Sequence, residues 1–151
     1  MNDNIRRPPL IIANSSWYLT HYRKLLINEV YKSYSDVVTL SPIDNTSKDL
    51  SECSLFIPWN IDRGKSKGLI SFIKSGLKLI FLIRGIKPRF IHSHTLLSNL
   101  LVSFVASLFS IPTVLSFPGL GNLYSNKGFN STILIFVFKV IILFSYISRN
   151  S

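Results

Sequence analysis

The chain has 151 residues, of which 47% are hydrophobic and 16% are charged; this composition excludes an intrinsically disordered protein and fits one domain with a hydrophobic core. Its formal net charge of +10 favours anionic partners such as phosphates, nucleic acid or a membrane surface. The single cysteine, Cys53, excludes an internal disulfide and a thiolate zinc cluster, and is typical of a small core residue in a reducing compartment.

Short apolar runs alternate with longer helical patterns from the first of these runs to the end of the chain. In chain order, the sequence predicts a strand at 10–13, a helix at 18–33, strands at 36–40 and 54–57, a helix at 66–86, a strand at 90–94, a helix at 95–110, a strand at 113–117 and a helix at 130–147. Strands that are separated by helices pair in parallel through right-handed crossovers. The predicted fold class is therefore α/β, a doubly wound, Rossmann-like parallel sheet of about five strands with helices on both faces.

Three segments are expected. Residues 1–7 form a flexible amino terminus, residues 8–128 form the Rossmann-like domain, and residues 129–151 form an apolar terminal helix. The apolar run at 10–13 is too short for a signal peptide although two arginines precede it, so the protein is expected in the cytoplasm.

The loop after the first strand consists of Asn14, Ser15 and Ser16. Small side chains and backbone N–H groups at the start of a helix suit a phosphate, because the helix dipole favours an anion there. Simple N-capping by Ser15 or Ser16 would explain the same composition.

Charge is distributed unevenly along the chain. Residues 1–62 hold all seven acidic residues and six basic ones, whereas residues 63–151 hold eleven basic residues and no acidic one. In the 66–86 helix, Lys67, Lys74 and Lys78 fall on one stripe. Four apolar residues fall opposite the stripe and should pack on the core: Ile70, Ile73, Leu77 and Ile80. The lysine stripe is either an ordinary solvated face or a basic face that lies on lipid headgroups.

Two histidines end the fourth predicted strand. The spacing of His92 and His94 places both imidazoles on one side of that strand, at the edge where parallel sheets bind ligands. His94 is nearer the loop and is the better candidate for hydrogen-bonding a substrate, whereas His92 fits a structural role equally well. Zinc is disfavoured because two histidines without a nearby carboxylate or thiolate leave its coordination incomplete.

Two later segments complete the set of candidates. The loop after the fifth strand contains Gly119, Gly121 and Asn122, which suit the close approach of a phosphate or sugar, although such turns are common. Residues 133–147 are almost entirely apolar but hold Lys139 and are short for a membrane span. A buried helix, an interfacial helix and a true span remain as alternatives.

The ordered combination of three segments resembles the amino-terminal half of family-four glycosyltransferases of the GT-B type, in the bacterial branch that builds envelope glycans. The matching segments are Ile11–Tyr18 with Tyr22 and Arg23, Lys87–Thr95, and Ile111–Val114 leading to Gly119–Gly121.

The resemblance implies an enzyme with two Rossmann-like domains that transfers a sugar from a nucleotide-sugar donor without a metal or other cofactor. The amino-terminal domain would bind a polysaccharide or lipid-linked acceptor at the inner face of the cell membrane, with the 14–16 loop near the donor diphosphate, His94 near the transferred sugar, and Gly119, Gly121 and Asn122 bordering the cleft. The donor domain of the family carries paired glutamates, and this sequence has no acidic residue after Asp62. A truncated or split enzyme, inactive without a second chain, is therefore expected.

Two non-enzymatic classes are alternatives. A nucleic-acid-binding module is disfavoured because the basic residues follow no recognisable binding motif. A small membrane-associated protein without catalysis would rest on the apolar segment at 133–147.

Overall fold

The computed structural model describes residues 7–61, 68–118 and 139–140. The strands are β1 (Leu10–Ile12), β2 (Val38–Ser41), β3 (Leu55–Pro58), β4 (Ile91–His94) and β5 (Thr113–Ser116). The helices are α1 (Ser16–Tyr22), α2 (Lys24–Tyr34), α3 (Ser47–Ser51), α4 (Gly68–Ile86) and α5 (Leu96–Leu108).

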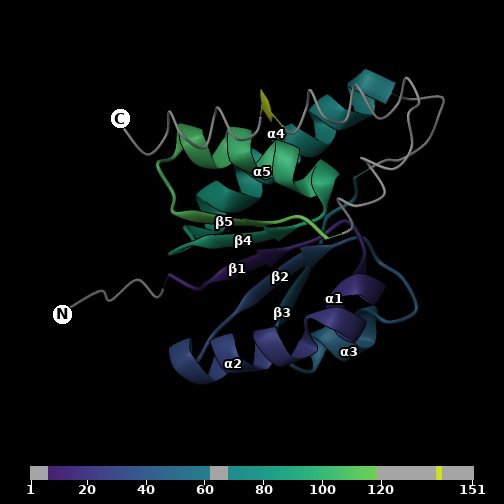
Figure 1. Ribbon diagram of the computed structural model, residues 1–151, viewed down its shortest axis with the longest axis vertical. Helices are drawn as coiled ribbons and strands as arrows, with labels where there is room; N and C mark the ends of the chain where they lie inside the picture. The colour runs from purple at the N-terminus through teal and green to yellow at the C-terminus, as the bar shows by residue number, and fades with distance from the viewer. Residues whose placement is uncertain (1–6, 62–67, 119–138, 141–151) are drawn as a thin grey trace.

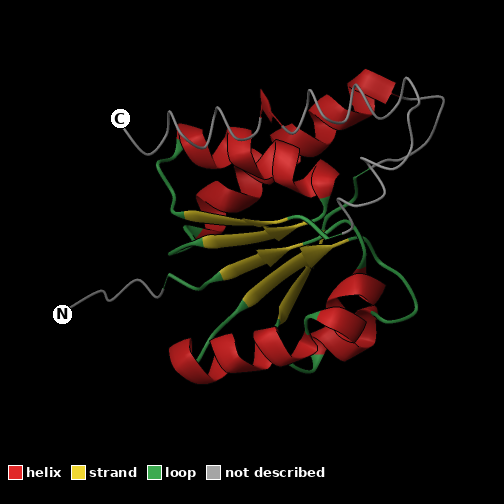
Figure 2. Ribbon diagram, viewed as in Figure 1, coloured by secondary structure: helices red, strands yellow, loops and turns green. Residues whose placement is uncertain are grey.

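These elements form three layers, with one parallel sheet between two layers of helices (Figure 1). Helices α1, α2 and α3 cover one face of the sheet, and α4 and α5 cover the other (Figure 2). The strand order is β3-β2-β1-β4-β5, so the chain moves outward from β1 to β3 and then crosses to the other side of β1. The predicted fold class is confirmed. The order reverses between β1 and β4, and the carboxyl ends of those two strands are where such sheets bind ligands.

All five predicted strands are present, but the helices differ in two places. The helix predicted at 18–33 is two helices that meet at Arg23, whose backbone (φ −126°, ψ 1°) departs from helical geometry. Helix α3 was not predicted, because its five residues are too few to show a helical period. The helix predicted at 130–147 lies outside the described residues except for 139–140.

Alternation along the strands divides the core into two clusters. Leu10 and Ile12 of β1 face α4 and α5, where they join Leu40, Ile83 and Ile91 among others. The neighbouring β1 residue Ile11 and the following Ala13 belong to the second cluster, with Leu19, Ile27, Val37 and Leu50. Cys53 is a free, half-buried thiol beside this second cluster, and burial raises its pKa. Both faces of β1 are thus covered, as a central parallel strand requires.

The predicted orientation of α4 is wrong in part. Ile80 packs partly against the core, but three of the four apolar residues expected there are exposed: Ile70 (70%), Ile73 (52%) and Leu77 (52%). Leu79 and Ile83 are buried instead. Because α4 is apolar around most of its circumference, its periodicity could not show which apolar face meets the sheet.

Candidate functional site

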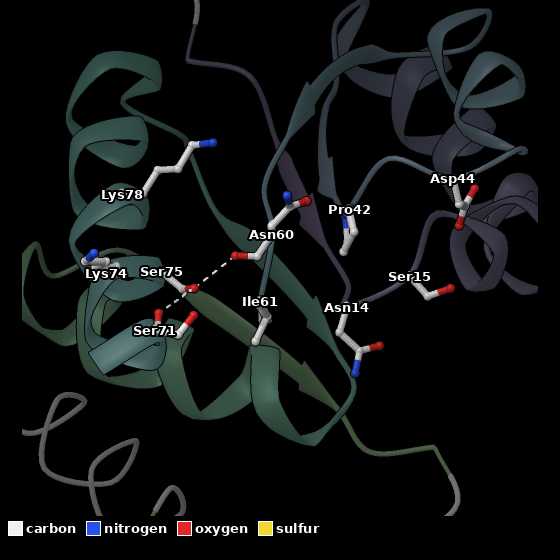
Figure 3. A pocket seen from close by; sticks show the side chains of 10 residues that line it. All are labelled: Asn14, Ser15, Pro42, Asp44, Asn60, Ile61, Ser71, Lys74, Ser75 and Lys78. Carbon is white, nitrogen blue, oxygen red and sulfur yellow. Dashed lines mark hydrogen bonds between the residues drawn. The ribbon is translucent and has the colours of Figure 1, made fainter. Parts of the chain in front are cut away.

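A pocket of about 610 Å³ lies at the carboxyl ends of β1, β2 and β3, against the first half of α4 (Figure 3). Eight of its ten lining residues carry polar side chains: the lining is Asn14, Ser15, Pro42, Asp44, Asn60, Ile61, Ser71, Lys74, Ser75 and Lys78. The pocket therefore combines three strand-end loops with the helix that carries the predicted lysine stripe.

The 14–16 loop divides into a part that lines the pocket and a part that holds the fold. Asn14 and Ser15 line the pocket, and the Ser15 hydroxyl also accepts a hydrogen bond from the backbone N–H of Tyr18 (3.3 Å), which caps α1. Ser16 is fully buried, and its hydroxyl lies 2.7 Å from that of Ser41 and donates to the carbonyl of Pro42. Ser16 therefore fastens the β1 loop to the end of β2 and does not itself line the pocket.

Asp44 is the one carboxylate among the described lining residues. Its partial burial raises the pKa, but hydrogen bonds from Thr46 and from the Trp17 backbone N–H (3.0 Å) outweigh this, and the net pKa lies below the ordinary value. Asp44 is thus ionised at neutral pH. The sequence did not predict Asp44 as a site residue, because an aspartate in a loop after a strand is also an ordinary turn residue.

Two of the three predicted stripe lysines, Lys74 and Lys78, lie on the pocket wall, and Lys67 lies outside the described residues. Their two positive charges exceed the single charge of Asp44, so the lining is net positive. Buried Ser75 between them fixes this part of α4, because its hydroxyl donates to the carbonyl of Asn60 (2.9 Å) and its own carbonyl accepts from the indole of Trp59 (3.1 Å). The pocket is chemically suited to an anion, with the Asn14 and Ser15 loop opposite the lysines (Figure 3).

The two histidines lie at the end of β4, on the α1 side of the sheet. Their ring centroids are 4.2 Å apart, as the spacing predicts. His92 Nε2 lies 2.8 Å from the hydroxyl of Ser116 on β5. His94 is fully buried, and neither of its ring nitrogens has a hydrogen-bond partner among the described residues.

Burial controls the charge of both imidazoles. Desolvation, the neighbouring His92 and the Arg23 guanidinium lower the pKa of His94 to about 3, and burial followed by Arg23 lowers that of His92. Both rings are thus neutral at pH 7 and can donate or accept a hydrogen bond.

Arg23 and Tyr18 surround His94 on the α1 side. The Arg23 guanidinium carbon lies 5.4 Å from the centre of the Tyr18 ring, which in turn lies 5.8 Å from that of His94. The Tyr18 hydroxyl and Arg23 Nε are further buried atoms without a hydrogen-bond partner in the described part of the chain. Polar atoms thus gather beside the strand end, and sequence spacing gave no sign that Arg23 would join them.

The described residues do not test three predictions: the glycine loop at 119–122, the absence of a metal, and the apolar segment at 133–147. Gly119, Gly121 and Asn122 lie outside the described residues. Within residues 7–61, 68–118 and 139–140, no three metal-ligating side chains come together, and the expectation that no metal is needed stays a prediction. None of the described helices is long and apolar enough to span a membrane.

The chain belongs to the glycosyl transferase 4-like family, whose sequence profile matches residues 10–146. Among solved structures, the fold resembles that of MurG from Acinetobacter baumannii, a GT-B glycosyltransferase, with a TM-score of 0.56 and 12% sequence identity. The match covers 86% of this chain but 39% of MurG, so the chain corresponds to less than half of that protein. No curated protein matches the sequence. The resemblance inferred from the sequence is confirmed at the level of family and fold.

Proposed function

We propose that this chain is the acceptor-side domain of a glycosyltransferase that moves a sugar from a nucleotide-sugar to an envelope polysaccharide or a lipid-linked acceptor. In this reaction an acceptor hydroxyl attacks the anomeric carbon, the bond from that carbon to the nucleoside diphosphate breaks, and the hydroxyl proton is released. The isolated chain is inactive under this proposal, and a donor-binding domain, in a longer chain or a separate one, completes the site.

The observation that carries the proposal is the pocket beside the switch point. Asn14 and Ser15 face Lys74 and Lys78 across a cavity of about 610 Å³, which is large enough for a diphosphate and part of its substituent. Hydroxyl and amide donors with two ammonium groups match the acceptor oxygens and the charge of a diphosphate. This diphosphate belongs either to the nucleotide-sugar or to the lipid-linked acceptor.

His94 serves in this proposal as a hydrogen-bonding group for the transferred sugar; because its side chain is fully buried, the neighbouring Tyr18 must move aside for the sugar to reach it. Its pKa of about 3 makes it a poor proton carrier at neutral pH, because a good general base has a pKa near the working pH. A neutral imidazole that is already desolvated can pair with a sugar hydroxyl without losing water at that moment.

The exposed side of α4 supports a second part of the proposal, peripheral association with the inner face of the cell membrane. Four exposed apolar residues form a helical stripe beside Lys74 and Lys78: Ile70, Ile73, Leu77 and Phe81. Apolar side chains flanked by lysines are typical of a helix that lies in the interface of an anionic membrane. A lipid-linked acceptor would then reach the pocket along α4.

Calorimetric titration with pyrophosphate tests the pocket. The double variant Lys74→Ala/Lys78→Ala should bind pyrophosphate at least about tenfold more weakly than the wild type at about 0.15 M salt, because two charges are lost. The double variant Lys32→Ala/Lys48→Ala removes two exposed lysines elsewhere and should change binding less than about twofold. Equal binding by all three proteins would remove the assignment. Parallel titrations with uridine diphosphate and farnesyl diphosphate distinguish the donor from the acceptor as the source of the diphosphate.

Sugar transfer tests the activity itself. The chain is combined with the domain encoded by a longer reading frame, or with a separate GT-B donor domain, and radiolabelled sugar is followed into the lipid fraction of membranes. Transfer should require both parts, and His94→Ala should lower its rate by about 10–100-fold. An undiminished rate in His94→Ala would remove the role assigned to this residue.

Vesicle sedimentation tests whether the exposed side of α4 binds a membrane. The chain should sediment with phosphatidylglycerol-containing vesicles and not with pure phosphatidylcholine, and Ile73→Ser/Leu77→Ser should reduce sedimentation more than Ser33→Ala on α2. Association that resists carbonate and does not depend on Lys74 and Lys78 would favour the alternative, a membrane-associated protein without catalysis.

A further inference from the structure

An exposed aromatic cluster lies next to the pocket and has no role in the proposal above. Trp17 and Tyr22 of α1 are 48% and 62% exposed, yet their rings pack on each other, with centroids 5.5 Å apart at 75°. His21 stacks on Trp17 at 4.6 Å and 25°, and its Nδ1 lies 2.9 Å from the Trp17 carbonyl. The contacts between these rings fix their positions, and much of the surface of the Trp17 and Tyr22 rings still faces solvent.

The cluster is anchored to the wall of the pocket. The backbone N–H of Trp17 donates to Asp44 (3.0 Å), and Ser15 caps the same helix; both Asp44 and Ser15 line the pocket. On its inner side, Tyr22 contacts Tyr18 at 5.6 Å, and Tyr18 contacts His94. The aromatic cluster is thus linked to the pocket wall through Asp44 and Ser15 and to the end of β4 through Tyr18.

We propose that Trp17 and Tyr22, whose rings meet edge to face at 75°, form an angled platform on which a pyranose ring of the acceptor saccharide stacks against one ring and contacts the other. One face of a pyranose carries several C–H groups and packs well on an aromatic ring, whereas its rim carries hydroxyls. The exposed, ionised Asp44 at the edge of the cluster is an acceptor for such a hydroxyl. Tyr and Trp side chains offer a large contact area with few rotatable bonds, so ordering them against a ligand costs little conformational entropy. The proposal rests on the proposed function, since it places the acceptor beside the diphosphate pocket.

The two tryptophans allow a direct test by ¹H–¹⁵N NMR of the full chain. The indole of Trp17 is the reporter, and that of Trp59, which is fully buried and bonded to Ser75, is the internal control. The probes are methyl glucoside, methyl galactoside, methyl mannoside and N-acetylglucosamine. Trp17→Phe assigns the two indole signals. At least one probe should shift the Trp17 signal with a dissociation constant on the order of 1–10 mM, as expected for so small a ligand, and leave the Trp59 signal in place.

Variants separate stacking from general surface binding. Tyr22→Ala should weaken the binding that the Trp17 indole reports by about tenfold, whereas Tyr31→Ala, which removes a 51% exposed tyrosine from α2, should change it less than about twofold. The proposal is overturned if no saccharide moves the Trp17 signal at about 100 mM, or if uridine monophosphate or lipid vesicles alone move it. Pyrophosphate added to the same sample should shift the amides of Lys74 and Lys78. A pyrophosphate response without a saccharide response rejects the platform and leaves the proposed function standing; silence with both probes rejects both.

Discussion

The two sides of the switch point are built in opposite ways from the same sheet edge. On the β1–β3 side, Asn14, Ser15 and the exposed Lys74 and Lys78 surround an open, positively charged pocket. On the β4 side, His94 is fully buried and carries no charge at neutral pH. The β1–β3 side is therefore suited to a hydrated, charged group, and the β4 side to hydrogen bonds in an environment from which water is excluded.

The helices explain this difference. Lys74 and Lys78 are exposed on the side of α4 that lines the pocket, opposite Asn14 and Ser15, so the pocket stays in contact with solvent (Figure 3). On the other face, Tyr18 of α1 packs beside His94, Arg23 at the α1–α2 junction packs on Tyr18, and His94 is fully buried from water. An anion is thus favoured on one side, and a charged imidazole is disfavoured on the other.

The largest change in stability should come from removing Trp59, whose indole supports α4 on the pocket side of the sheet. Trp59→Ala removes a fully buried side chain and its hydrogen bond to Ser75, and should lower the free energy of unfolding by about 3–5 kcal/mol. Leu25→Ala, at an 82% exposed position on α2, should change it by less than about 0.5 kcal/mol. Urea denaturation followed by circular dichroism measures both. Similar values for the two variants would contradict the packing described for Trp59.

A smaller effect should appear on the β4 side when the pH falls. The unfolded chain protonates His94 near pH 6.5, but the folded chain does so only near pH 3, so stability is present above pH 6.5 and is lost as the pH falls through this window. Between pH 8 and pH 5, His94 alone should cost about 2 kcal/mol.

The variant His94→Leu should remove this part of the pH dependence, whereas His21→Leu, which keeps His94, should retain it. Urea denaturation at pH 8 and pH 5 provides the measurement. The same loss of stability in His94→Leu as in the wild type would show that His94 does not titrate as described.

The smallest of the three effects tests the link between β1 and β2. Ser16→Ala removes the buried hydroxyl that contacts Ser41 and Pro42, and should destabilise the fold by about 1–2 kcal/mol. Pyrophosphate binding should weaken as well if this link holds the loop of Asn14 and Ser15 in place. Ser33→Ala, which removes an exposed hydroxyl from α2, should alter neither quantity by a measurable amount. Unchanged stability in Ser16→Ala would show that the link is dispensable.

The sequence predicted the strands and the histidine pair well for identifiable reasons. Buried parallel strands are short apolar runs, and His92 and His94 share a side because strand residues alternate with a period of two. It predicted α4 less well, because a helix that is apolar around most of its circumference has no unique buried face. The exposure of Ile73 and Leu77 is therefore a result that only packing against the sheet could decide.

By itself, then, the sequence determined the fold class and the edge of the sheet at which the chemistry is expected, because these follow from local patterns of hydrophobicity and turn residues. The family followed from the resemblance of three ordered segments to known glycosyltransferases. Only the tertiary structure decided that Lys74 and Lys78 line a pocket with Asn14 and Ser15, and that Arg23 and Tyr18 lie beside His94. These groups are far apart along the chain, and the strand order and helix packing that bring them together cannot be read from the spacing of the residues.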